Sequence, residues 1–335
     1  MSIIDFFFRY KKGKVSSQPP CHLLQLPVDM LVEILAFLPP YTLLLVYQTC
    51  RPLRTIIHQF FLAGRGDILS NATPEDRLLY LTHSSRLQPD RWVCAKCCKL
   101  HRIHGEDTPY KSSPRHLSCV DGLDISERYG ESKYFAYVPK HRHVQLTLKY
   151  TRLENKERVY NKYLLKLLEP YHHQLQEAYW TITRGVEVRF SAYPKVVNGR
   201  YLLLSIWTYL DYEIKVSRKS IRYLDICPHY SQREVRQNLH WGAIALAGIE
   251  RALDTAFAIR GAPMRFSCGS CKTDFSIETS SGRVTICIWQ DFGPEGTVFD
   301  KGWAAIARDT GALYHRRQSI RQLYGPHNHG GEMIE

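Results

Sequence analysis

The chain has 335 residues, of which 44% are hydrophobic and 23% are charged, a balance that is ordinary for a globular protein and excludes a fibrous or wholly disordered one. This length allows a small unit together with one sizeable domain or two modest ones. A membrane-spanning helix needs about 18 apolar residues in a row, and Glu33 and Pro39-Pro40 interrupt the most hydrophobic run, 30–47, so we expect no membrane segment.

The first segment, residues 1–20, ends in the sequence SSQPP and is predicted to be a flexible arm. Its basic residues follow its apolar run, which is the reverse of a secretory signal peptide. We therefore expect the chain in the cytosol or the nucleus. Disulfides are rare in those compartments, so the ten cysteines are interpreted first as free thiols or metal ligands.

Residues 22–61 predict three short helices. Pro27 suits the first turn of a helix, where its missing N–H costs nothing. Pro39-Pro40 ends that helix, and Thr49 is a suitable cap for the third one. The apolar positions of the first helix share one face at spacings of three and four residues, and these are Leu31, Ile34, Leu35 and Leu38.

A helical segment of about 40 residues has more large apolar side chains here than one internal face can hold. The surplus consists of Leu26, Leu31, Ile34, Leu38, Leu44 and Leu45. Two interpretations remain open. The surplus surface either binds a partner protein or packs against the rest of the chain.

The order and spacing of these residues resemble an F-box. The motif runs from Leu26-Pro27 through Asp29, Leu31 and Glu33 to Leu38, continues at Leu43-Leu44, and ends in Thr49-Cys50-Arg51-x-Leu53-Arg54. This third helix is similar to that of F-box proteins from filamentous fungi. It departs from many F-boxes in carrying Leu53 where they have tryptophan. The resemblance assigns residues 21–62 to an F-box.

The resemblance implies a substrate-receptor subunit of an SCF-type cullin-RING ubiquitin ligase, which docks on a Skp-type adaptor and, through it, on a cullin scaffold. Such a subunit presents a target protein, of unknown identity here, and performs no chemistry itself. The residues expected to contact the adaptor are Leu26, Pro27, Leu31, Ile34, Leu35, Leu38 and Leu44.

The remainder, residues 63–324, is predicted to be one α+β domain with a mainly antiparallel sheet, followed by a disordered tail at 325–335. Thr73 and Pro74 predict the start of a helix. Alternating apolar residues predict strands over 144–150, 186–190, 202–216 and 284–288, and a helical pattern covers 153–180, where Pro170 breaks or bends the run. The spacing Ser231-x-x-Glu234 is a capping box, which predicts another helix start.

Two C-x-x-C pairs, Cys94/Cys97 and Cys268/Cys271, predict one structural zinc site of four thiolates, because two such turns supply a tetrahedral ligand set. The pairs are far apart in sequence, so the fold would have to bring them together. Some similar fungal F-box proteins carry comparable early and late pairs, which implies a structural module. The alternative ligands are Cys98, His101, His104, Cys227 and His229.

Eight basic residues against two acidic ones fall within residues 140–166, in a chain of net charge +13. This stretch is either a solvated basic face or a surface for acidic partners, so a zinc-stabilised nucleic-acid-binding protein is the alternative function, although no known nucleic-acid-binding motif accompanies it. The sequence has no zinc-protease motif, phosphate loop or nucleophile elbow, which favours a protein that is not an enzyme.

Overall fold

The computed structural model describes residues 21–63, 72–110, 137, 139–154, 157–175, 185–221, 224–231, 239–307, 312–329 and 332–334. It divides into two compact units, Met1–Ala72 and Thr73–Glu335. The division falls at residue 72, whereas the sequence placed it at residue 62. The predicted arm at 1–20 and most of the predicted capping box lie outside the described residues.

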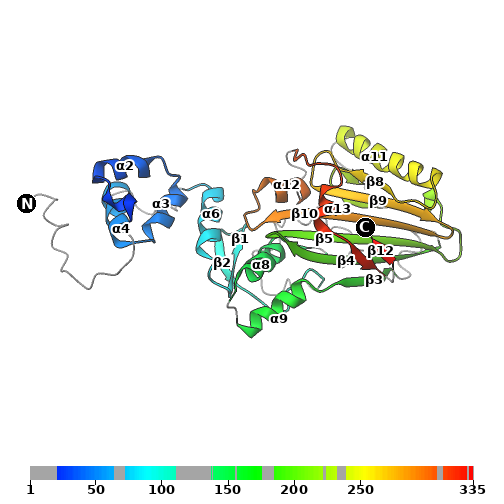
Figure 1. Ribbon diagram of the computed structural model, residues 1–335, viewed down its shortest axis with the longest axis horizontal. Helices are drawn as coiled ribbons and strands as arrows, with labels where there is room; N and C mark the ends of the chain where they lie inside the picture. Colours follow the sequence, from blue (N-terminus) through cyan, green and yellow to red (C-terminus); the bar gives the residue numbers. More distant parts are fainter. Residues whose placement is uncertain are drawn as a thin grey trace, which may run out of the picture. The chain divides into compact units, whose positions relative to one another are not determined.

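The first unit is helical, as predicted (Figure 1). Its elements are η1 (His22–Gln25), α2 (Val28–Ala36), α3 (Pro40–Tyr47), α4 (Arg51–Ile57) and the π-helical turn η2 (His58–Leu62). Pro27 and Pro39 precede α2 and α3 as their N-caps. The cap of α4 is Cys50 and not Thr49, because the Thr49 hydroxyl donates backwards to the carbonyl of Val46 at 2.7 Å.

The second unit is built on a six-stranded sheet whose neighbours are all antiparallel, in the order β3-β4-β5-β10-β9-β8 (Figure 1). The strands are β3 (Tyr171–Leu175), β4 (Val186–Val197), β5 (Arg200–Asp211), β8 (Met264–Ser267), β9 (Thr273–Ser280) and β10 (Arg283–Pro294). Two-stranded hairpins accompany it: β1 (Arg91–Cys94) with β2 (Lys99–Arg102), and β6 (Asp225–Cys227) with β7 (Tyr230–Ser231). The predicted α+β class is confirmed.

Helices cover both faces of this sheet. On one face, α11 (Leu239–Ala258) packs on β8 and β9, α8 (His141–Arg152) on β4 and β5, and α12 (Lys301–Ala307) on β10. On the other face, α13 (Ser319–Tyr324) packs on β9, β10 and β4. The remaining helices are α6 (Pro74–Ser84), η5 (Arg218–Ser220) and α9 (Arg158–Leu167). Of the helices in the described residues, none combines the length and the apolar character that crossing a bilayer requires.

A two-residue turn, Asn198-Gly199, sets the register between the strands β4 and β5. Both residues have positive φ, 50° for Asn198 and 68° for Gly199. This is the backbone of a type I′ turn, whose twist matches that of paired strands. The turn therefore fixes which side chains of β4 and β5 share each face of the sheet.

The predicted strand over 144–150 is instead the helix α8. Its alternating apolar residues belong to two helical faces, each with a spacing of four residues. Val144 and Leu148 pack into the core under the sheet, whereas Leu146 and Tyr150 pack into a second core with Trp92 of β1. Burial on two sides produces the same alternation as a strand.

Three further predictions differ from the structure. The strand predicted to reach residue 216 ends at Asp211, whose carboxylate accepts the Val216 N–H at 2.6 Å and closes a turn. Within the described part of 153–180, the helix α9 ends at Leu167, shortly before the predicted break at Pro170, and the strand β3 follows where the helical pattern was expected to continue. The tail at 325–335 contains the paired strands β11 (His327–His329) and β12 (Glu332–Ile334), and the His327 ring lies 4.1 Å from that of Tyr193.

Candidate functional site

The Cys268/Cys271 pair lies in the turn between β8 and β9. Both residues are buried, with 2% and 0% of their surface exposed. The N–H of Ser270 points at the Cys268 sulfur at 3.3 Å, and the Cys268 N–H donates to the carbonyl of Thr273 at 2.8 Å. A tight turn with its amides directed at sulfur stabilises a thiolate, so the pair is arranged as half of a metal site.

The other half of this site comes from the β6–β7 hairpin. Cys227 and His229 lie there, and their ligand atoms and the two sulfurs of Cys268 and Cys271 all fall within 4.8 Å of one another. Cys227 is 1% exposed. Three thiols and one imidazole form a complete tetrahedral zinc set, and we name it the Cys3His cluster.

The close packing of these groups separates the acidities of the thiols. Hydrogen bonds from Cys227 and Cys271 hold the pKa of Cys268 well below its usual range. Burial raises the pKa of Cys227 far above it. Closely spaced thiols in a buried place are costly to ionise together, and a bound cation would stabilise their thiolates.

The second predicted pair, Cys94 and Cys97, does not join Cys268 and Cys271. The structure groups it with His101, and the three ligand atoms lie within 4.8 Å of one another. Cys94 belongs to the core between β1, α8 and α9, whereas Cys268 and Cys271 belong to the core under the sheet. The four-thiolate site is therefore corrected to two separate clusters, because each C-x-x-C turn is anchored in a different core.

The Cys94/Cys97/His101 group, here the Cys2His cluster, is held by the β1–β2 hairpin. The Cys98 N–H donates to the carbonyl of Cys94 at 3.0 Å, and Cys98 takes a left-handed φ of 49°. The Cys97 sulfur lies 3.0 Å from Nε2 of His101, whose ring stacks on Trp92 with centroids 5.2 Å apart. Burial, followed by the charge of Lys99, lowers the pKa of His101 and favours the neutral imidazole that binds metals.

Among the alternative ligands, the structure selects Cys227, His229 and His101. Within the described residues, Cys98 and His104 belong to neither cluster. The sequence signal for Cys227 and His229 was the compact Cys-Pro-His triplet at 227–229, although nothing in it identified the pair Cys268/Cys271 as its partner.

The helical unit has a small core of its own. Leu31, Leu35 and Leu43 are between 3% and 7% exposed and pack with Ile56 and Ile57 of α4. Leu26 and Leu38 are half-buried against the same core.

Comparison with known families matches residues 23–63 to the F-box-like family. Residues 23–63 form an F-box-like domain. No curated protein and no solved structure matches the chain. The comparison therefore covers the first unit, and the second unit is described by its own geometry.

The F-box-like domain places the predicted contact residues in three classes. Leu31 and Leu35 are buried in its core, Leu26, Leu38 and Leu44 are half-buried, and Pro27 and Ile34 are exposed. A second stripe, spaced four and three residues along α2, faces outward: Met30, Ile34 and Phe37 are 50%, 43% and 86% exposed. Sequence reasoning missed Met30 and Phe37, although they repeat the spacing of Leu31, Leu35 and Leu38 one position earlier.

Proposed function

We propose that this chain is the substrate-receptor subunit of an SCF-type ubiquitin ligase. The F-box-like domain would dock on a Skp-type adaptor, which bridges to a cullin scaffold and its RING subunit. The chain would contribute no catalytic group. It would act by holding a target protein beside the activated ubiquitin, which raises the effective concentration of the reacting lysine. The same proposal places the chain in the cytosol or the nucleus.

The observation that carries this proposal is the outward stripe of α2 in an F-box-like domain. Met30, Ile34 and Phe37 expose a contiguous apolar strip, and a surface helix of a lone domain normally directs its apolar residues inward. A protein partner that covers the strip would remove this exposed area from water. The adaptor is the partner that the F-box-like match favours.

We infer that the Cys3His cluster binds a structural zinc ion. All four ligand positions are supplied by the chain, so no open position remains for a substrate or a catalytic water. A bound ion would join the β6–β7 hairpin to the β8–β9 turn and stabilise the second unit, which we propose as the target-binding part.

The alternative of a nucleic-acid-binding protein is not favoured by the basic stretch at 140–166. Arg142 and Lys149 are 5% and 4% exposed, so their charges do not face solvent. The Arg152 guanidinium is paired with Glu295 at 2.8 Å. A phosphate backbone is bound through accessible cations, whereas Arg142 and Lys149 are buried and the exposed Arg152 is already held in an ion pair.

The experiment is co-purification with a Skp-type adaptor. The double change Ile34→Lys with Phe37→Ser alters only exposed side chains of α2 and should abolish adaptor binding while leaving the helical core intact. Leu31→Asp is unsuitable because Leu31 is a core residue. A matched control is Leu165→Lys, which places a charge at another exposed apolar site, 71% exposed on α9. Adaptor binding that survives the double change would argue against the proposal.

A further inference from the structure

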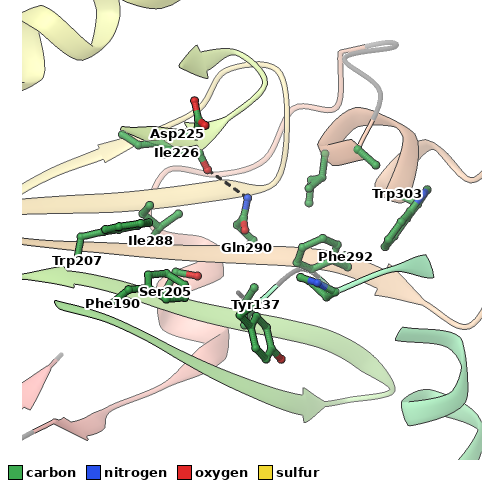
Figure 2. Close-up of a pocket in the computed structure, with 14 residues that line it drawn as sticks. Tyr137, Phe190, Ser205, Trp207, Asp225, Ile226, Ile288, Gln290, Phe292 and Trp303 are labelled. Carbon is green, nitrogen blue, oxygen red and sulfur yellow. Dashed lines mark hydrogen bonds between the residues drawn. The ribbon is translucent and has the colours of Figure 1, made fainter. Parts of the chain in front are cut away.

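A cavity of about 70 Å³, which is continuous with solvent, lies on the sheet face that carries α8, α11 and α12 (Figure 2). Its floor is formed by β4, β5 and β10, through Phe190, Ser205, Trp207 and Gln290 among others. The β6 strand forms its roof and α12 one end (Figure 2). We propose that this cavity is a binding site for a small, neutral, mostly aromatic molecule.

The cavity exists because three helices leave part of this face uncovered. The α11 helix packs on β8 and β9, at the far edge of the sheet, while α8 and α12 pack on β4, β5 and β10. Alternate residues of the central strands face the space between them, which the described helices do not fill. On the opposite face, Ile320 and Tyr324 of α13 pack on apolar side chains of the sheet.

Aromatic rings line both ends of the cavity. At one end, Phe190 and Trp207 lie with centroids 4.6 Å apart, and at the other, Phe292 and Trp303 lie 5.6 Å apart. Figure 2 shows the two pairs on either side of the central space. Flat rings at both ends of the cavity favour a planar apolar ligand, which can stack on them or meet them edge to face.

Two polar side chains supply direction without charge. The Gln290 carboxamide is 4% exposed and donates from Nε2 to the carbonyl of Ile226 at 3.2 Å, which fixes its orientation under the roof (Figure 2). The Ser205 hydroxyl lies at the floor. A few fixed polar groups in a mostly apolar lining are typical of small-molecule sites, and the small volume of this cavity suits a ligand of about one ring.

The lining excludes a charged ligand. Asp225 is the one charged side chain among the described residues of the lining, and Figure 2 shows its carboxylate turned away from the sheet. A charged ligand group at the centre of the cavity would lose its hydrating water and gain no counter-charge, which is strongly unfavourable. The site is therefore matched to a neutral molecule with one hydrogen-bonding group, and it does not depend on the ligase role.

The test uses full-length protein and the neutral one-ring molecule 4-fluorophenol as a probe. We expect saturable binding to one site, with a shifted ¹⁹F resonance of the probe and altered tryptophan emission, because Trp207 and Trp303 line the cavity. Ser205→Phe fills the cavity from the floor and Ala307→Phe fills it from α12. Each should weaken probe binding about tenfold or more. The matched control, Thr285→Phe, adds the same bulk on the opposite face of β10 and should bind like the wild type.

Thermal unfolding of each variant establishes whether it is folded. If Ser205→Phe does not fold, probe binding to Ala307→Phe tests the proposal. The probe could also bind the exposed stripe of the F-box-like domain. Undiminished binding in a folded cavity-filling variant, or loss of binding with Ile34→Lys and Phe37→Ser, would overturn the proposal. So would the absence of saturable binding in the wild type.

Discussion

Arg142 and Asp107 form a buried, two-pronged ion pair, in which Nε donates to Oδ2 at 2.6 Å and a terminal guanidinium nitrogen donates to Oδ1 at 2.9 Å. Their side chains are 4% and 7% exposed, and His143 lies 3.2 Å from the same carboxylate. Burial raises the pKa of Asp107, but the hydrogen bonds from Arg142 and His143 outweigh it and hold that pKa well below its usual range. The pair ties the segment after β2 to α8.

Replacing Asp107 with asparagine should strongly destabilise the second unit, because Arg142 would keep its charge in a buried place without a counter-charge. We expect a loss of about 3–5 kcal/mol in the free energy of unfolding, measured by urea titration. The control is Asp90→Asn, which breaks an exposed pair with Arg91 at 3.3 Å and should cost about 1 kcal/mol or less. Equal losses for the two variants would contradict the role assigned to Asp107.

The two cysteine clusters predict two zinc ions per chain, each lost independently. Cys268→Ser should remove the ion of the Cys3His cluster only, and Cys97→Ser that of the Cys2His cluster only, with the double variant retaining neither. Elemental analysis of the dialysed full-length protein measures this. Cys287→Ser is the control, since Cys287 is a buried thiol outside both clusters. If the wild type bound one ion, and either single variant bound none, the four-thiolate site would be restored.

The metal ligands illustrate what the sequence could and could not predict. Each C-x-x-C turn is a local feature, so its spacing correctly indicated two thiols aimed at one point. The choice of partner is a matter of topology: β6 lies beside β9, which brings Cys227 to Cys268, whereas the β1–β2 hairpin packs on α8 and α9. No local pattern encodes that choice.

The helix α8 shows the same limit for secondary structure. Assigning secondary structure from apolar periodicity assumes that a segment buries one face. The helix α8 buries more than one face, including the polar side chains of His143, Thr147 and Lys149. The strands β4, β5 and β10 were located correctly, although β5 ends at Asp211 and not at 216, because successive residues of a strand alternate between the two faces of one sheet. Burial on two sides is a property of the fold, which a single segment does not reveal.

Gly199 should be sensitive to substitution for a purely conformational reason. Its φ is 68°, and an added Cβ would meet no atom within 4 Å, so Gly199→Ala would cost only backbone strain, about 1–2 kcal/mol in unfolding free energy. Gly105→Ala is the matched control, because a Cβ there also meets nothing and φ is not in the left-handed region. Equal stabilities of the two variants by urea titration would argue against a type I′ turn.

Lys149 gives the fold a dependence on alkaline pH. Its ammonium donates to the carbonyl of Arg91 at 2.8 Å, and burial lowers its pKa from 10.5 to about 8. Between these pH values the unfolded chain binds more protons than the folded one, so stability should rise with pH, by up to about 1.4 kcal/mol per pH unit. Below pH 8 both states carry the proton and this contribution to the slope vanishes.

Urea unfolding of the wild type and of Lys149→Met at several pH values between 7 and 10.5 isolates this contribution, because the two proteins share every other ionisable side chain. The variant should lose the rise, whatever its absolute stability. Lys166→Met is the control, since Lys166 lies near the surface with its ammonium 2.7 Å from Glu106, and it should keep the wild-type slope. An unchanged slope in Lys149→Met would mean that Lys149 remains charged in the fold throughout this range.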